Sequence, residues 1–412
     1  MKKWIIGLVA GGALAAGGFA LFADDINSAR AALEYQGLFK PDVIDENFRT
    51  MYEKYSSVKV SKGDAVYELP ENFHDDALPL EYEYEGETKN LKDFLKNTQA
   101  TGVAVLHKGK LVYEMYDRGN TRESRCLLMS VSKSMASFLI GVAYEAGDIE
   151  SLNDQVIKYV PSLKGSAYDG ATVQDVLEMS SGARWDEDYS RIDSDIVQSI
   201  IASKTGSLDA FTASVPREFE PGTYNRYSSI DTHALGMILR GATGKPYRDY
   251  FEEKLWSRLG AEDDMYLQID AVGEPIAYGG VNARLRDMVR FGKLYLDGGV
   301  NHKGERLVSE NWIKTSTTPD SPRLAPGANN PQSSNRYGYK YQWWTPHHPD
   351  GEDFMALGIY GQFIYVNPAR DVVIARTSAY QDFTVDGGYM LYETIVAFQQ
   401  VARYLSPDSD ES

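Results

Sequence analysis

Two residues one helical turn apart, Ser130 and Lys133, have the types and spacing of a nucleophile and its base. Side chains at positions i and i+3 lie on one face of a helix, so the lysine amine would reach the serine hydroxyl. Serine is a weak nucleophile and needs such a base. A free lysine has a pKa of about 10.4, so burial or a neighbouring positive charge must lower that pKa before the amine accepts a proton. The spacing predicts acyl transfer through Ser130.

The pattern Ser-x-x-Lys is weak evidence alone, because it occurs twice in this chain. Ser56 and Lys59 also fit it, but no apolar helix follows them, and we interpret this match as chance in a loop or strand. Ser130 instead begins an apolar stretch with helical periodicity that runs to Glu145 and ends at Gly147. Backbone N–H groups are unpaired where a helix begins, so the N–H of Ser130 is available to an oxyanion.

A second candidate element lies about a hundred residues further along the chain. The turn at Pro221-Gly222 precedes Tyr227, Ser228 and Ser229, and a helical pattern follows. A tyrosine beside a serine–lysine pair could relay a proton to the leaving group. Taken alone, a tyrosine in front of a helix is more often a packing residue.

Strand-like runs occur near both ends of the catalytic region. Residues 102–106 and 111–116 flank a short turn and predict a β-hairpin, and residues 361–366 and 372–375 predict a second one. A helical stretch follows at 389–404.

The segment between these hairpins has mostly helical patterns. The predicted helices cover residues 130–145, 173–179, 232–240, 247–259 and 285–296. We therefore expect an α/β (α+β) fold. An antiparallel sheet would be built from both chain ends and flanked by helices, with an inserted, mostly helical region at about 145–330.

Four stretches, read in order, resemble a known superfamily. They are Leu-Met-Ser-Val-Ser-Lys-Ser at 128–134, Val-Leu-Glu-Met-Ser-Ser-Gly at 176–182, the segment 221–227 around Tyr227, and the Gly-Gly to Phe-Gly stretch at 279–292. Together they resemble the serine β-lactamase and penicillin-binding-protein superfamily, in its class C-like and esterase-like branch. The resemblance spans about residues 100–400. It implies a β-lactamase/transpeptidase-like fold and serine hydrolase activity without a metal or other cofactor.

Within that superfamily the chain is most similar to the 6-aminohexanoate-dimer hydrolase family, in the runs 185–189, 342–344 and 358–362. The resemblance implies cleavage of a small-molecule amide or ester, with Ser130 the nucleophile, Lys133 the base and Tyr227 the proton relay. It also implies an oxyanion hole made by the N–H groups of Ser130 and Ile359. The substrate contacts it implies come from Tyr189, Ser229, Tyr278 and Tyr360.

At three places the chain departs from the patterns of these families, so the sequence does not identify the substrate. Ala356-Leu357-Gly358 stands where β-lactamases have Lys-Thr-Gly, so the lysine that recognises a β-lactam carboxylate is missing. Tyr360 replaces a histidine of the amide hydrolases, and Tyr278 replaces a substrate-contacting asparagine. The alternatives are an esterase, a β-lactamase, a D-Ala-D-Ala carboxypeptidase, or a non-catalytic penicillin-binding-like module of the cell envelope.

Other hydrolytic mechanisms lack their motifs. The chain has no Gly-x-Ser-x-Gly elbow, and we interpret His347 and His348 as surface residues of a Pro- and Asp-rich loop. It has no His-Glu-x-x-His. The acidic cluster at 186–188 has no histidine near it, so we interpret it as an exposed acidic turn.

The composition is that of a globular protein, and its charge disfavours nucleic acid as a partner. The 412 residues are 43% hydrophobic and 25% charged, which is ordinary for a globular protein, and the net charge of −17 disfavours nucleic acid. Cys126 is the only cysteine, so no intramolecular disulfide forms, and we expect its thiol to be buried.

We predict an N-terminal extension at 24–95, a hydrolase domain at 96–405 and an acidic tail at 406–412.

The N-terminus has the pattern of an export signal. Lys2 and Lys3 precede the uncharged run from Trp4 to Ala23, and two aspartates follow it. Residues 1–23 are therefore predicted to be a cleaved signal peptide or a retained membrane anchor. Either would export the catalytic domain, which would be periplasmic or anchored through residues 4–23, with no other membrane contact. Nothing in the sequence specifies the oligomeric state.

Overall fold

The computed structural model describes residues 27–408, apart from residues 75, 327–336, 385 and 387. The apolar run at 4–23, predicted to be a signal or anchor, lies outside this part of the chain. Among the described residues, none of the helices is both long enough and apolar enough to span a bilayer.

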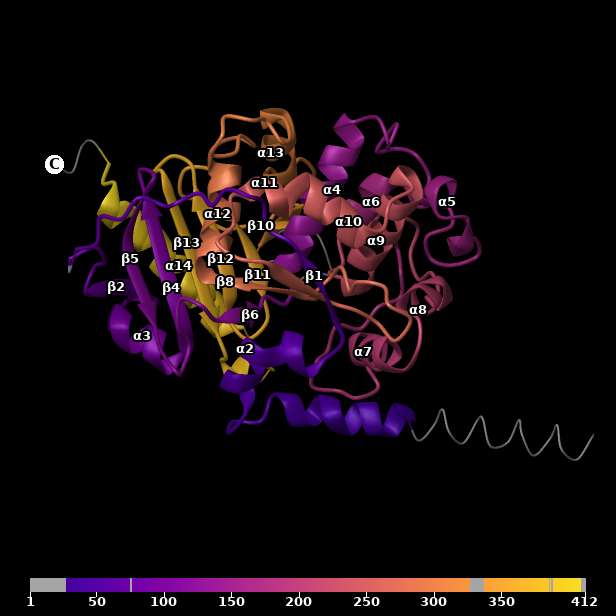
Figure 1. Ribbon diagram of the computed structural model, residues 1–412, viewed down its shortest axis with the longest axis horizontal. Coiled ribbons are helices and arrows are strands. Elements are labelled where there is room, and N and C mark those ends of the chain that lie inside the picture. The colour runs from indigo at the N-terminus through magenta and orange to yellow at the C-terminus, as the bar shows by residue number, and fades with distance from the viewer. Residues whose placement is uncertain (1–26, 75, 327–336, 385, 387, 409–412) are drawn as a thin grey trace, which may run out of the picture.

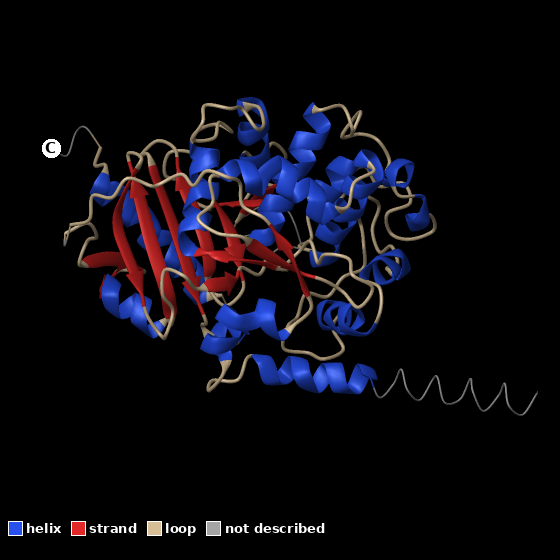
Figure 2. Cartoon of the chain, in the orientation of Figure 1, coloured by secondary structure: helices blue, strands red, loops and turns tan. Residues whose placement is uncertain are grey.

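Seven strands form the main antiparallel sheet, which is built from both ends of the catalytic region as predicted (Figures 1 and 2). Within the sheet one pair joins an early strand to a late one, with Val105 opposite Ile374. In spatial order the strands are β5 (Lys110–Tyr116), β4 (Ala100–His107), β13 (Val372–Ser378), β12 (Gln362–Asn367), β11 (Phe354–Gly358), β10 (Trp343–Thr345) and β9 (Gly338–Lys340).

Both faces of this sheet are covered, so every residue of the inner strands β12 and β13 is buried. On β13, Val372 and Ile374 belong to the core shared with α14 (Tyr389–Leu405), whereas Val373 and Ala375 belong to the core on the opposite face. Side chains alternate between faces along a strand, so a continuous apolar run supplies two cores. The helix α12 (Leu285–Leu296) packs on that second face.

Most other helices lie to one side of the sheet, where α9 is the central helix on which α4, α5, α6, α7, α8 and α10 pack (Figure 1). Residues 27–38 form a further helix at the edge of the molecule. The remaining elements are α2 (Ile44–Lys54), α3 (Leu91–Asn97), α4 (Val131–Glu145), α5 (Val156–Tyr159), η1 (Pro161–Leu163), α6 (Val173–Leu177), α7 (Asp195–Thr205), α8 (Leu208–Ser214), α9 (Ser229–Thr243), α10 (Tyr247–Phe251), η2 (Glu252–Trp256), α11 (Ser257–Leu259), α13 (Glu310–Thr317) and η3 (Gln381–Thr384).

A second, four-stranded sheet was not predicted from the sequence. Its order is β1 (Ser57–Val60), β7 (Met265–Gln268), β8 (Val281–Arg284) and β6 (Arg125–Leu127), and a separate hairpin joins β2 (Glu81–Tyr84) to β3 (Glu87–Asn90). The strands are too short for a clear period-2 signal, and β1 comes from the N-terminal extension. The second Ser-x-x-Lys match lies here: Lys59 is on β1 and pairs with Asp264 at 3.0 Å. That match is on a strand, as predicted.

Gly292 allows α12 to lie close against the main sheet. A Cβ atom at this position would come within 2.6 Å of Val373 Cγ1 and 2.8 Å of Ile364 Cγ2. Gly292, the last residue of the 279–292 stretch, therefore has a packing role, because a methyl group there would displace α12 from the strands.

We expect Gly292→Ala to lower the free energy of unfolding by about 1–3 kcal/mol, because the added methyl overpacks the contact between helix and sheet. Thermal or urea denaturation of the purified protein measures this change. The control is Gly37→Ala, since a Cβ at Gly37 meets no atom within 4 Å and the residue lies in the 27–38 helix. Equal stability of both variants would show that the α12 contact is looser than the structure indicates.

Candidate active site

Ser130 and Lys133 are in direct contact at the beginning of α4. Lys133 Nζ donates a hydrogen bond to Ser130 Oγ at 2.7 Å and another to the backbone carbonyl of Tyr278 at 2.9 Å. Ser130 occupies the N-cap position, but its side chain makes no capping hydrogen bond to the helix backbone. Its hydroxyl is thus directed at the amine.

The electrostatic surroundings of Lys133 suit a base. The side chain is 1% exposed, and this burial lowers its pKa to about 7, while the Glu187 carboxylate acts in the opposite direction. A buried ammonium loses hydration, so the neutral amine is favoured. A substantial fraction of Lys133 is therefore neutral at physiological pH and able to accept the Ser130 proton.

The residue before the nucleophile has an unusual backbone conformation. Met129 has φ of +49°, in the left-handed region that residues other than glycine rarely adopt. Its carbonyl accepts a hydrogen bond from Ser132 Oγ at 2.7 Å, and Leu128 N–H bonds to Val281 on β8 at 2.8 Å. The chain therefore turns sharply between β6 and α4 and presents Ser130 to the cleft. Strain of this kind is concentrated at functional sites.

Tyr227 reaches the Ser130–Lys133 pair from the loop before α9. Its ring stacks on Trp344 at a centroid distance of 5.1 Å, and Lys133 Nζ lies 5.2 Å from the ring centroid. Burial and the Glu187 charge raise the pKa of the phenol above its usual range, while a hydrogen bond with Ser130 lowers it. The phenol therefore stays protonated and is suited to donate a proton rather than to act as the base.

The prediction that residues 186–188 form an exposed acidic turn is wrong for Glu187. This carboxylate is half-buried in the cleft and accepts hydrogen bonds from the Trp185 indole, from Tyr189 at 2.8 Å, and from both the backbone N–H (3.0 Å) and hydroxyl of Ser229. Four donors stabilise an anion beside the active site. The available sequence signal was a carboxylate between two aromatic side chains that carry donors, Trp185 and Tyr189.

Two cavities meet at the nucleophile, one of about 270 Å³ and one of about 410 Å³. Ser130, Tyr189 and Ile359 line both of them. The part of the Ile359 N–H in an oxyanion hole stays a prediction. Tyr278 lines only the smaller cavity and Tyr227 only the larger one.

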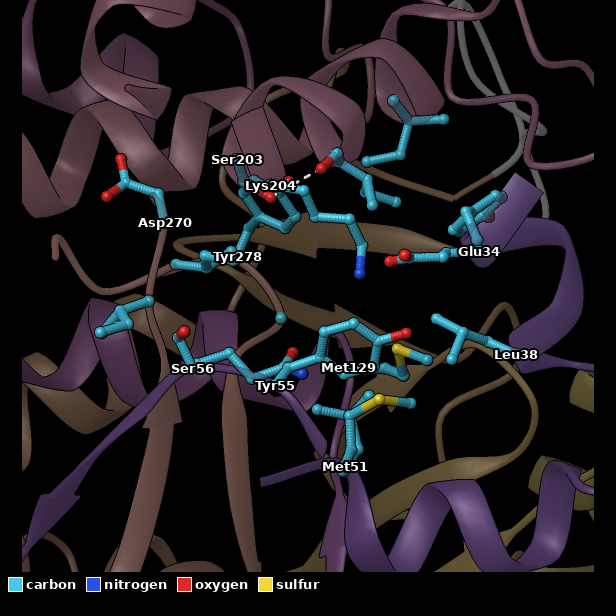
Figure 3. Close-up of a pocket in the computed structure, with 18 of the residues that line it drawn as sticks. Glu34, Leu38, Met51, Tyr55, Ser56, Met129, Ser203, Lys204, Asp270 and Tyr278 are labelled. Carbon is cyan, nitrogen blue, oxygen red and sulfur yellow. Dashed lines mark hydrogen bonds between the residues drawn. The ribbon is translucent and has the colours of Figure 1, made fainter. Parts of the chain in front are cut away.

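We call the smaller cavity the N-terminal pocket, because the extension forms one of its walls (Figure 3). No motif in the extension predicted this contribution, which arises only when the 27–38 helix and α2 fold over the hydrolase domain. The wall residues from the extension are Glu34, Tyr35, Leu38, Phe39, Met51, Tyr55 and Ser56.

We call the larger cavity the aromatic pocket, after the tyrosine, tryptophan and phenylalanine side chains in its lining. Beyond Ser130 and Tyr227 it is bounded by side chains from β10, from the loop before β9 and from the region around α14. They include Tyr337, Trp344, Phe383, Leu391 and Tyr392.

Two of the predicted substrate-binding residues lie behind the cavity walls. Ser229 is fully buried, bonds to Glu187 and lines neither pocket. The Tyr360 ring also lines neither pocket; it stacks on Phe39 at 4.7 Å and meets Phe48 edge-on at 5.5 Å. Both side chains position groups that do line a cavity, and their direct contact with substrate stays a prediction.

The remaining sequence interpretations concern residues away from catalysis. Cys126 is buried as predicted, and burial raises the pKa of its thiol to about 11, so it is not a second nucleophile. His347 and His348 are exposed, as expected for a surface loop.

The rate of covalent labelling of Ser130 by a fluorophosphonate should rise with pH to a plateau, with a midpoint near 7. The reason is that Lys133 accepts a proton only as the neutral amine, and its pKa is about 7. The midpoint comes from second-order labelling rates measured between about pH 5 and about pH 9, a range that spans this pKa.

Lys133→Met should label at least about a hundredfold more slowly, as expected when a general base is lost. Lys59→Met provides the matched control, since this lysine belongs to the chance motif on β1 and its side chain is 52% exposed. A flat pH profile, or equal loss in both variants, would remove Lys133 from the role of base.

Comparisons with known proteins agree with this geometry. A family model described as "Beta-lactamase" matches residues 88–396. The 6-aminohexanoate-dimer hydrolase of Paenarthrobacter ureafaciens is 30% identical over 300 residues, which cover 71% of this chain and 76% of that protein. A protein of Escherichia coli strain K12, provisionally named D-alanyl-D-alanine carboxypeptidase, is 24% identical over 168 residues, which cover 39% of this chain and 38% of that protein.

A solved structure with the same fold comes from Bacillus anthracis and is provisionally named a 6-aminohexanoate-dimer hydrolase. It superposes with a TM-score of 0.79 at 23% sequence identity, and the match covers 89% of this chain and 95% of that one. At this identity the likeness establishes the shared fold.

Proposed function

The chain belongs to the beta-lactamase family of serine hydrolases, and from this premise we propose that it cleaves small amide or ester substrates through an acyl-enzyme on Ser130. One observation carries the proposal: the 2.7 Å hydrogen bond that joins the Ser130 hydroxyl to a buried lysine whose pKa is about 7. That contact supplies an activated nucleophile without a histidine or a metal.

The reaction has two steps. In the first, Ser130 Oγ attacks the substrate carbonyl while Lys133 takes its proton, and the oxyanion is stabilised by the N–H groups of Ser130 and Ile359. Tyr227 donates a proton to the leaving amine or alcohol as the carbonyl re-forms. Lys133 then passes the proton it took from Ser130 to Tyr227, which restores the neutral amine and the phenol. In the second step water attacks the acyl-enzyme as the amine takes its proton, and that proton returns to Ser130 Oγ as the acyl–oxygen bond breaks.

The two cavities divide the substrate between them. Tyr227, the proton donor, lines the aromatic pocket and not the N-terminal pocket. The leaving group that receives its proton therefore occupies the aromatic pocket, and the acyl group occupies the N-terminal pocket.

Hydrolysis of an open-chain amide or ester is favoured over β-lactam or D-Ala-D-Ala cleavage. The lysine that would recognise a carboxylate on the leaving-group side is replaced by Ala356, which is fully buried in β11. The charged side chains that line the aromatic pocket are instead those of Glu187 and Asp188, and their carboxylates repel an anionic leaving group.

We also propose that the enzyme acts outside the cytoplasm, either free in the periplasm or anchored through residues 4–23. The support is the sequence pattern of Lys2 and Lys3 followed by an uncharged run to Ala23. In cell fractionation, the full-length protein should be found in the periplasmic or the membrane fraction, whereas protein lacking residues 1–23 should stay in the cytoplasm.

Ser130→Ala should reduce kcat/KM for p-nitrophenyl acetate by at least about a thousandfold, because the acyl-enzyme no longer forms. Mass spectrometry after fluorophosphonate treatment should find the label on the Ser130 peptide of the wild type. A Ser56→Ala variant, altered in the chance motif, should carry the label on that same peptide. Undiminished turnover by Ser130→Ala would refute the proposal.

Tyr227→Phe should impair amide hydrolysis more than hydrolysis of an activated ester. An amine needs a proton to leave, whereas p-nitrophenolate departs without one, so we expect about a hundredfold loss on a p-nitroanilide and about tenfold or less on the matched p-nitrophenyl ester. Phenylalanine retains the ring that stacks on Trp344. Equal losses on the two substrates would instead assign Tyr227 to activation of the nucleophile.

A further inference from the structure

The N-terminal pocket contains a lysine that forms no ion pair with any carboxylate of the described residues. Lys204, in the last turn of α7, extends its ammonium group into the cavity (Figure 3). The nitrogen lies 3.4 Å from the centroid of the Tyr55 ring. Within the part of the chain that the structure describes, the ammonium donates no hydrogen bond and has no carboxylate oxygen within 4.0 Å, so the Glu34 carboxylate acts on it only through its charge.

The other charged side chains of this pocket are Glu34 and Asp270, and both already have partners. Glu34 pairs with Arg30 at 3.1 Å on the 27–38 helix. Asp270 accepts hydrogen bonds from backbone N–H groups at 2.8 to 3.0 Å, namely those of Leu208, Val272 and Glu274. The charged group that remains for a ligand is therefore the Lys204 ammonium.

The walls between Ser130 and Lys204 are largely apolar. The extension contributes Leu38 and Met51, and Ile200 lies one turn before Lys204 on α7. Such a passage accommodates methylene groups, while the ammonium at its side favours an anion, with which it forms a charge-assisted hydrogen bond.

We propose that this pocket binds acyl groups with a carboxylate at their free end and that Lys204 holds that carboxylate. The substrates would be half-amides or half-esters of aliphatic dicarboxylic acids. This inference rests on the proposed function for the assignment of the acyl group to the N-terminal pocket. Burial lowers the pKa of Lys204 to about 8 and Glu34 acts against that shift, so the ammonium form predominates at neutral pH.

Glu34 faces Lys204 across the pocket and opposes the binding of an anion (Figure 3). Removing its charge should therefore strengthen the preference for a carboxylate. The alternative is that Lys204 and Glu34 attract each other only to hold the pocket wall closed. In that case removing the Glu34 charge would loosen the wall and weaken the preference for a carboxylate.

The kinetic test uses the mono-p-nitrophenyl esters of succinic, adipic and suberic acids, each beside its methyl-capped diester. For the chain length that fits best, we expect wild-type kcat/KM to be about tenfold higher with the free carboxylate than with the cap. Lys204→Met should abolish this ratio, Lys204→Arg should retain it, and Glu34→Gln should increase it. Lys164→Met, at an exposed lysine outside both pockets, should leave the ratio unchanged.

A binding measurement separates this inference from the catalytic proposal. Calorimetry with Ser130→Ala should show adipamic acid binding about tenfold more tightly than hexanamide, and the added Lys204→Met change should remove the difference. If this binding preference is found but no ester is hydrolysed, the proposed function fails and the pocket assignment stands. Ester hydrolysis without any carboxylate preference, or with a preference that persists in Lys204→Met, would overturn the pocket assignment alone.

Discussion

The burial of one amine beside one hydroxyl is the constraint on which the chemistry of this protein depends. A lysine in water is protonated at neutral pH and cannot activate a serine. Desolvation inside the domain lowers the pKa of Lys133 to about 7, and the backbone carbonyl of Tyr278 fixes the direction of its nitrogen. The fold must therefore enclose Lys133 while it leaves Ser130 in contact with two cavities.

The Glu187 carboxylate acts on the pKa of both groups beside Ser130. Its charge raises the pKa of Lys133 and of Tyr227, so it acts against the desolvation of the lysine and favours the protonated form of the phenol. The four hydrogen bonds that it accepts fix the position of the carboxylate. One half-buried carboxylate thus acts on both groups: it opposes the loss of the proton from Lys133, and it keeps Tyr227 protonated as a proton donor.

The N-terminal extension changes the site from an open cleft to a pocket with a defined wall. It is joined to the hydrolase domain by the pairing of β1 with β7 and by the stacking of Phe39 on Tyr360. Tyr360 therefore supports a wall residue, while Tyr55 of the extension lies beneath the Lys204 ammonium. The selectivity proposed for the acyl group depends on both parts of the chain.

The sequence by itself determined the elements with strong local patterns. The two hairpins, the α4 and α12 helices and the Ser-x-x-Lys pair were predicted because periodicity and i,i+3 spacing are local properties. The second sheet, the inward position of Glu187 and the pocket wall from residues 34–56 were decided only by the tertiary structure. In each case the partners are far apart in the chain, as with Glu187 and Ser229, and burial gives a charged side chain its function only after distant segments have packed around it.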